Sequence, residues 1–132
     1  MNIKLILSHP IHYHTALIKF LTKKGIKIKV LFRSNMHTKK FYDPGFNKKI
    51  NIATNVLDGF KYEYLNYVGP NKVGSILPLT TEFISKIFDK KTDIIWLHGI
   101  KNWYNLFLII LAKVYKKKVF IRDEVYHGSK NR

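Results

Sequence analysis

The sequence predicts one α/β domain over residues 1–132, with a mostly parallel sheet of about five strands in the order 3-2-1-4-5 and helices on both faces. Three observations predict it. Short apolar runs alternate with longer amphipathic runs, the first such unit has the pattern strand, helix, strand, and no internal repeat or linker interrupts the alternation. Because such a unit crosses right-handed and forms parallel strands, the pattern predicts a Rossmann-like sheet.

The first unit opens with a short apolar strand, Ile3 to Leu7, followed by a histidine-rich turn, His9 to His14. From Thr15 apolar residues recur at the spacing of a helix face, and lysines followed by Gly25 stop the helix. Ile26 to Phe32 is the second strand. The loop after the first strand lies at the carboxyl edge of the sheet, where open α/β sheets bind ligands, so three histidines fall where chemistry is expected.

Residues 33–55 lose periodicity and form a predicted loop. A turn of sequence Asp-Pro-Gly begins at Asp43, because proline presets one dihedral angle and glycine accepts a positive one. Tyr42 and Phe46 flank this turn. Aromatic residues in a long loop either serve a function or pin the loop to the core, and both interpretations stay open at Tyr42, Asp43 and Phe46.

The remaining elements follow in order. They are a strand at 60–65, a helix from Thr80 or Thr81 to the lysines at 90–91, a strand at 93–97, a helix from Asn102 or Trp103, and a strand at 119–121. The last helix is rich in large apolar residues, which is typical of a crossover helix packed on a core and also of a helix at a membrane surface.

In the predicted strand order the first and fourth strands are neighbours where the order reverses. One crevice should then gather the candidate site residues His9, His12, His14, His98, Gly99, Arg122, Asp123 and Glu124. Histidine can act as acid, base or hydrogen-bond donor near neutral pH, carboxylates accept hydrogen bonds from hydroxyls, and arginine pairs with phosphate. For each histidine alone, a structural hydrogen bond at a strand end is the alternative.

Metal binding is a further alternative at this crevice, because His12 and His14 with Asp123 are suitable ligand types. Nothing else in the chain completes a recognisable ligand set, so no metal is assigned. Sequence motifs for dinucleotide binding, for a P-loop and for a hydrolase nucleophile elbow are missing, and Ser8 beside His9 gives no triad. No cofactor is therefore expected in this chain.

The net charge is +16, from 21 lysines and three arginines against eight acidic residues. This charge reflects either a compositional bias towards Lys, Ile and Asn or a functional basic face. Scarce arginine disfavours nucleic acid as a partner, so a functional basic face points to peripheral contact with an anionic membrane. The chain has no cysteine, no signal-peptide pattern and no apolar run near the roughly 20 residues needed to span a bilayer, so a cytoplasmic location is predicted.

The chain resembles the amino-terminal domain of GT-B glycosyltransferases of the family 4 type. The resemblance covers nearly the whole chain and rests on five motifs: S-H-P-I-H-Y-H at 8–14, Y-D-P-G-F at 42–46, V-L-D-G-F-K-Y-E-Y-L at 56–65, D-I-I-W-L-H-G at 93–99 and R-D-E at 122–124. It implies an acceptor-side domain whose histidines and Gly99 line a cleft. Where relatives often read R-G-E-S, this chain has Asp123 and Val125 in place of glycine and serine.

The resemblance also implies transfer of a sugar from a nucleotide-sugar donor to a glycan or lipid-linked acceptor, as in polysaccharide or lipopolysaccharide biosynthesis. The family's donor-binding domain lies beyond the stretch that the chain resembles, so the 132 residues alone are expected to be inactive and to need a carboxyl-terminal partner domain or chain. Two alternatives stay open. One is a binding or interaction module that takes a sugar or phosphate without turnover, and the other is a nucleic-acid-binding domain driven by the charge.

Overall fold

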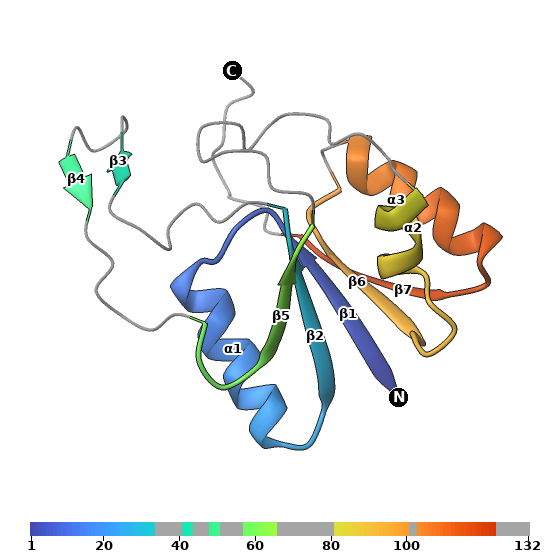
Figure 1. Ribbon diagram of the computed structural model, residues 1–132, viewed down its shortest axis with the longest axis horizontal. Coiled ribbons are helices and arrows are strands. Elements are labelled where there is room, and N and C mark those ends of the chain that lie inside the picture. Colours follow the sequence, from blue (N-terminus) through green and yellow to red (C-terminus); the bar gives the residue numbers. More distant parts are fainter. Residues whose placement is uncertain (34–40, 44–47, 51–56, 66–80, 101–102, 124–132) are drawn as a thin grey trace.

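The computed structural model describes residues 1–33, 41–43, 48–50, 57–65, 81–100 and 103–123 (Figure 1). Its elements are, in chain order, β1 (Asn2–Leu7), α1 (His12–Lys23), β2 (Lys27–Phe32), β3 (Phe41–Asp43), β4 (Lys48–Ile50), β5 (Lys61–Tyr64), α2 (Thr81–Ile87), β6 (Ile94–His98), α3 (Trp103–Val114) and β7 (Lys118–Arg122). None of the helices in these ranges is long and apolar enough to cross a membrane.

The main sheet has five strands in the order β5-β2-β1-β6-β7, and every neighbouring pair is parallel. The predicted order 3-2-1-4-5 and the α/β class are therefore confirmed. The order reverses between β1 and β6, where Ile3 to Ile6 pair with Ile94 to Leu97. This reversal brings the carboxyl end of β1 beside that of β6, which positions the candidate site.

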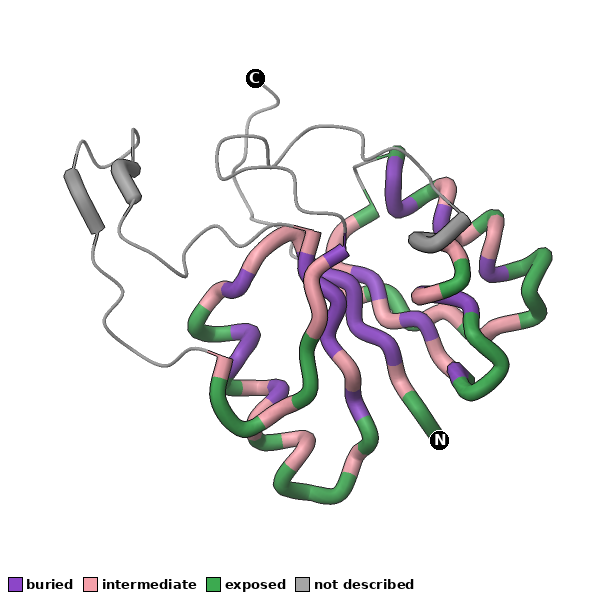
Figure 2. The backbone as a smooth tube through the Cα atoms, in the orientation of Figure 1, coloured by how far each residue is buried: buried purple, intermediate pink, exposed green. Residues whose placement is uncertain are grey.

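Helices cover both faces of the sheet, α1 on one and α2 with α3 on the other (Figure 1). The reason is the period of two along the strands, since neighbouring residues point to opposite faces. Leu5 and Leu7 of β1 pack with Ile18 of α1, whereas Ile6 packs with Ile87 of α2 and Leu108 of α3. Figure 2 shows the central strands as the most continuously buried part of the described chain.

Two predicted helix boundaries were wrong, and one predicted loop contains a pair of strands. The first helix begins at His12 rather than Thr15, because the amide of Thr15 already bonds the carbonyl of Ile11 at 3.0 Å and the Thr15 hydroxyl bonds that of His12 at 2.9 Å. The predicted loop after β2 contains a two-stranded antiparallel hairpin, β3–β4. Helix α2 ends at Ile87, short of the lysines, because Asp89 and Thr92 form a local turn with bonds of 2.6 and 3.2 Å.

The long helices α1 and α3 end in the same hydrogen-bond pattern. After α1 the amides of Gly25 and Ile26 bond the carbonyls of Thr22 and Leu21 at 3.0 and 3.1 Å. After α3 the amides of Lys116 and Lys117 reach back in the same way, at 3.1 and 2.8 Å. This closure places one residue in the left-handed region, and glycine adopts it without strain. That residue is Gly25 (φ 82°) after α1 and Lys116 (φ 53°) after α3.

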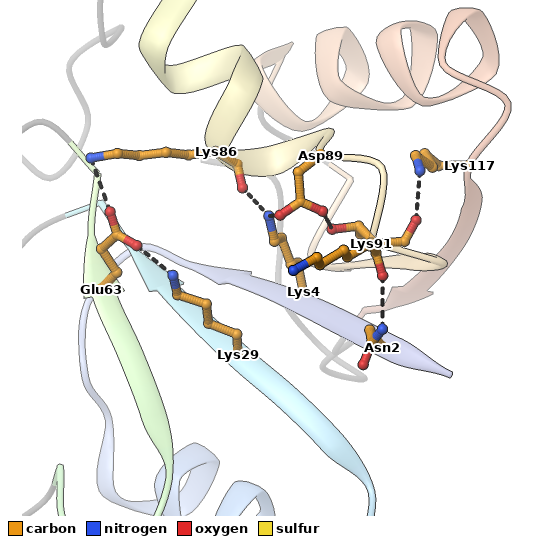
Figure 3. Close-up of polar contacts among 9 residues, drawn as sticks. Asn2, Lys4, Lys29, Glu63, Lys86, Asp89, Lys91 and Lys117 are labelled. Carbon is orange, nitrogen blue, oxygen red and sulfur yellow. Dashed lines mark hydrogen bonds and ion pairs between the residues drawn. The ribbon is translucent and has the colours of Figure 1, made fainter.

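The amino half of the sheet holds a network of paired charges (Figure 3). Lys4 is buried on β1 and its ammonium donates to the Lys86 carbonyl and to Asp89, the latter at 2.7 Å. Glu63 accepts from Lys29 at 2.6 Å and pairs with Lys86 at 2.9 Å. Partial burial raises the pKa of Asp89, but hydrogen bonds from Lys4 and Thr92 outweigh it and hold the pKa at about 2. These lysines therefore have a structural role, because they pair with carboxylates and because Lys4 bonds the carboxyl end of α2.

Candidate functional site

The candidate site lies at the carboxyl edge, between the ends of β1 and β6. His98 is the last residue of β6, and His14 lies in the first turn of α1, which follows β1. Their rings meet edge to face, with centroids 4.4 Å apart. The Tyr13 ring also contacts the His14 ring, with centroids 4.3 Å apart. The reversal of strand order therefore brings together two histidines that are 84 residues apart in the sequence.

His14 is buried, and its Nε2 atom has no hydrogen-bond partner among the described residues. Burial lowers the pKa of His14 from 6.5 to about 4, and the nearby basic groups of His98, Arg122 and His9 act in the same direction. The imidazole is therefore neutral at neutral pH. A buried nitrogen left unpaired costs about 1–3 kcal/mol, so each such group calls for an explanation, and a role in binding or catalysis is one.

The backbone around His98 is held by α3. The side-chain amide of Asn105, which is buried, donates to the carbonyls of His98 and Gly99 at 2.9 and 2.7 Å. The Gly99 amide in turn donates to the Arg122 carbonyl at the end of β7, at 2.8 Å. Gly99 has φ 76°, a conformation in which any Cβ is strained. The end of β6 is thus fixed from both sides, so the His98 ring is presented from a rigid support.

Arg33 and Tyr104 form a second feature of this edge, which was not predicted from the sequence. Arg33 directly follows β2, and its amide donates to the Leu7 carbonyl at 2.9 Å. Its guanidinium lies over the Tyr104 ring, 4.1 Å from the centroid. Burial lowers the pKa of Arg33 and raises that of Tyr104. One signal was available in the sequence, since Arg33 is one of only three arginines and comes directly after a strand.

The structure brings together part of the predicted set. His9, His98 and Arg122 all lie close enough to His14 to act electrostatically on it. Gly99 and Asp123 flank them, since a Cβ on Gly99 would lie 3.9 Å from Asp123 Oδ1. His9 shares a hydrogen bond of 2.9 Å with the Ser8 hydroxyl. The backbone of Tyr42 and Asp43 lies in β3, in the separate hairpin. Glu124 and Phe46 lie outside the described residues.

His12 does not join His14, because both residues lie in α1. Residues two apart on a helix point to different sides, and accordingly His12 is exposed whereas His14 is buried. The alternative of a metal held by His12 and His14 is therefore wrong for this geometry. Within the described ranges no group of three or more His, Cys, Asp or Glu residues could hold a metal ion.

A hollow of about 840 Å³ lies away from this site, at the amino edge of the sheet. Its lining includes Lys4, Lys27, Lys29, Lys61 and Lys91, together with Asp89, and none of the predicted site residues. The carboxyl end of α1, which carries the negative end of the helix dipole, also opens onto this hollow through Thr22 and Gly25. The lysines around the hollow offset the negative end of that dipole. Their presence therefore has a structural reason, and the hollow does not indicate a particular ligand.

Comparison of the chain with protein-family models, with characterised proteins and with solved structures finds no match. The fold and the carboxyl-edge site are therefore the structural basis for assigning a function.

Proposed function

We propose that this chain is the acceptor-side domain of a glycosyltransferase, which transfers a sugar from a nucleotide-sugar donor to a glycan or a lipid-linked acceptor. The observation that carries the proposal is the His14–His98 ring pair, 4.4 Å apart at the reversal of strand order. That reversal is where open α/β sheets bind their ligands. The sequence resemblance assigns the same edge to the acceptor.

The two histidines have different parts in this proposal. The half-buried His98 contacts an acceptor hydroxyl, since it ends β6 at the rim of the sheet. His14 lies behind it as a positioning residue, because its Nε2 is covered and its ring packs edge-on against His98. An imidazole suits a hydroxyl ligand, since its ring nitrogens can form hydrogen bonds with a hydroxyl group. Arg122, half-buried at the end of β7, suits a phosphate on a lipid-linked acceptor.

The donor is bound by a second domain or chain in this proposal, as the resemblance implies. Transfer requires stabilisation of the nucleotide leaving group, and the described residues contain no recognisable diphosphate cradle at the acceptor edge. The chain by itself is then expected to bind acceptor and to transfer nothing. The second candidate function is a sugar- or phosphate-binding module without turnover. It would also bind its ligand by itself, but it would need no partner domain.

The first test is a titration of the histidine-labelled chain with a panel of saccharides and of nucleotide sugars, followed by NMR of the ring protons. We expect a saccharide to shift the His98 signals and the nucleotide sugars to leave them in place. His98→Ala should abolish binding of that saccharide, and His12→Ala, at an exposed histidine in the first turn of α1, is the matched control. If no saccharide moves the His98 signals, the acceptor-side role fails.

The second test adds a candidate donor-binding domain encoded beside this chain's gene and measures transfer of a radiolabelled sugar. Transfer that needs both parts, and that His98→Ala lowers, supports the glycosyltransferase. Saccharide binding with no transfer by any pairing supports the binding module instead.

A further inference from the structure

Helix α3 carries a second apolar stripe on the side that faces away from the sheet. The residues of its core side, at 104, 105, 108 and 112, are buried. Trp103, Leu106, Ile110 and Val114 recur at spacings of three and four, so they lie on one face, and they are 57%, 49%, 60% and 69% exposed. At a rise of about 1.5 Å per residue this stripe is roughly 16 Å long.

Exposed apolar side chains in a row of this length need an explanation. Single exposed leucines are ordinary on a protein surface, whereas a contiguous apolar row marks a surface that binds something. The stripe is longer and more apolar than the equivalent face of α1, a helix of the same length, where Tyr13, Ala16 and Phe20 are followed by Lys24. The outer side of α1 mixes the exposed residues His12, Tyr13, Ala16, Phe20 and Lys23.

The charges beside the stripe identify the kind of partner. Three exposed lysines lie beyond the amino half of the stripe: Lys113 in the last turn of α3, Lys116 just after the helix and Lys118 at the start of β7. No acidic residue occurs from Trp103 to Arg122. With a net charge of +16, a second copy of the chain would be repelled rather than attracted. An anionic lipid surface accepts both parts of this pattern, since the apolar row enters the acyl boundary while lysines remain among the headgroups.

We propose that the outer face of α3 docks the protein on an anionic membrane surface. Trp103, Leu106, Ile110 and Val114 enter the boundary between headgroups and acyl chains, with the helix lying in the plane of the surface. Lys113, Lys116 and Lys118 face the lipid phosphates. Trp103 suits this depth, because an indole ring places an apolar body in the lipid and its N–H near the headgroups.

Docking of α3 also places the candidate site near the lipid. Asn105, in the first turn of α3, bonds the backbone of His98 and Gly99, so the end of β6 follows the amino end of this helix. A lipid-linked acceptor would then reach His98 without leaving the membrane. This consequence rests on the proposed function, whereas the docking itself does not.

The test uses vesicles of phosphatidylcholine alone and of phosphatidylcholine with phosphatidylglycerol. The chain has two tryptophans, so Trp96→Phe leaves Trp103 as the only indole. We expect co-sedimentation, a blue shift of Trp103 emission and quenching by brominated acyl chains with the anionic vesicles alone. Unshifted Trp103 emission on bound vesicles would overturn the proposal, since the protein would then bind through another face.

Paired variants separate the stripe from general surface properties. Ile110→Gln with Val114→Gln should weaken vesicle binding by about tenfold or more. Phe20→Gln, at an exposed aromatic of α1 (56%), is the control and should leave binding unchanged. Because these positions are exposed, the circular dichroism melting curves should coincide, so lost binding is not lost folding. Equal loss in the control overturns the assignment to α3.

A second pair tests the lysines. Lys113→Gln with Lys118→Gln should weaken binding roughly 30-fold, since each lysine near an anionic surface contributes about 1 kcal/mol. Lys23→Gln with Lys24→Gln removes the same charge at the end of α1 and should have a much smaller effect. Similar losses from both pairs would mean attraction by net charge alone and would overturn the docking geometry. A dimer in sedimentation velocity without lipid that the double Gln variant of 110 and 114 abolishes would assign the stripe to a protein partner instead.

Discussion

Helices α1 and α3 are built alike and differ in what their surfaces are for. Each has 12 residues, follows a central strand at the carboxyl edge, crosses one face of the sheet and ends in the same closing pattern. Each also carries a buried polar residue at its third position, His14 in α1 and Asn105 in α3. The shared features belong to the fold, so the differences indicate function.

The two buried polar residues show the first difference. Asn105 is held by two backbone carbonyls, so its burial stabilises the end of β6. His14 Nε2 has no hydrogen-bond partner among the described residues, and burial with nearby basic groups lowers its pKa. The outer faces show the second difference, since that of α1 is mixed and that of α3 is apolar. Helix α3 therefore supports the site from within and has an apolar surface outside, whereas α1 supplies the histidine with the unpaired nitrogen.

The largest expected effect is a loss of stability when the buried side of either helix is truncated, and it should be similar for α1 and α3. Ile18→Ala in α1 and Leu108→Ala in α3 each remove a fully buried side chain from a packed core. We expect each to lower the free energy of unfolding by about 2–5 kcal/mol, measured by urea denaturation. Ile110→Ala on the outer face of α3 is the control and should change it by less than about 0.5 kcal/mol. A large loss from Ile110→Ala would show that the outer stripe is covered in the folded chain.

The next effect is a pH dependence of stability, which is expected from His14 and not from Asn105. Because the folded pKa of His14 is about 4 and the ordinary value is 6.5, the unfolded chain binds more protons between these values. The free energy of unfolding should therefore fall as pH drops from 6.5 to about 4, by up to about 3 kcal/mol from this residue, and its contribution is unchanged above pH 6.5.

The pH dependence is checked by urea denaturation across that window. His14→Gln should remove most of the slope, whatever its effect at neutral pH, since glutamine does not titrate. His12→Gln is the matched control, because this histidine is exposed, and it should keep the slope. An unchanged slope in His14→Gln would mean that His14 is not desolvated as described.

Asn105→Ala tests the structural role of the polar residue in α3. The substitution leaves the carbonyls of His98 and Gly99 without the donor that holds them, so we expect a loss of about 1–3 kcal/mol in the free energy of unfolding. The loss should not depend on pH, in contrast to that of His14. Asn105→Asp is informative as well, because the carboxylate cannot donate to a carbonyl and should fare no better than alanine at neutral pH.

The smallest effect concerns the residues that close the helices. Gly25→Ala forces a Cβ into the left-handed region and should cost about 1 kcal/mol, with no steric clash since nothing lies within 4 Å of that Cβ. Lys116→Gly relieves the same strain at φ 53° and should raise the free energy of unfolding by about 0.5 kcal/mol. If urea denaturation shows a loss of stability for Gly25→Ala and a gain for Lys116→Gly, the two helix ends are equivalent. Changes of the same sign in both variants would show that they are not.

The fold class, the strand order and the sheet edge that carries the histidines could all be predicted from the sequence. Alternation of apolar and amphipathic runs is a local property, and the right-handed crossover of parallel strands converts it into one topology. The sequence also predicted the stop of α1 at Gly25, because the glycine and the lysines before it are adjacent in the chain.

Which side chains contact one another depends on the tertiary structure. The start of α1 at His12 separates His12 from His14, and the strand order then pairs His14 with His98 and leaves Lys4 with Asp89, 85 residues away. The contact of Arg33 with Tyr104 has the same origin. For α3, the sequence is apolar nearly all round, and the sheet alone selects the side that is buried. Local patterns set periodicity, whereas these pairings depend on where distant segments cross, and no short-range pattern encodes that.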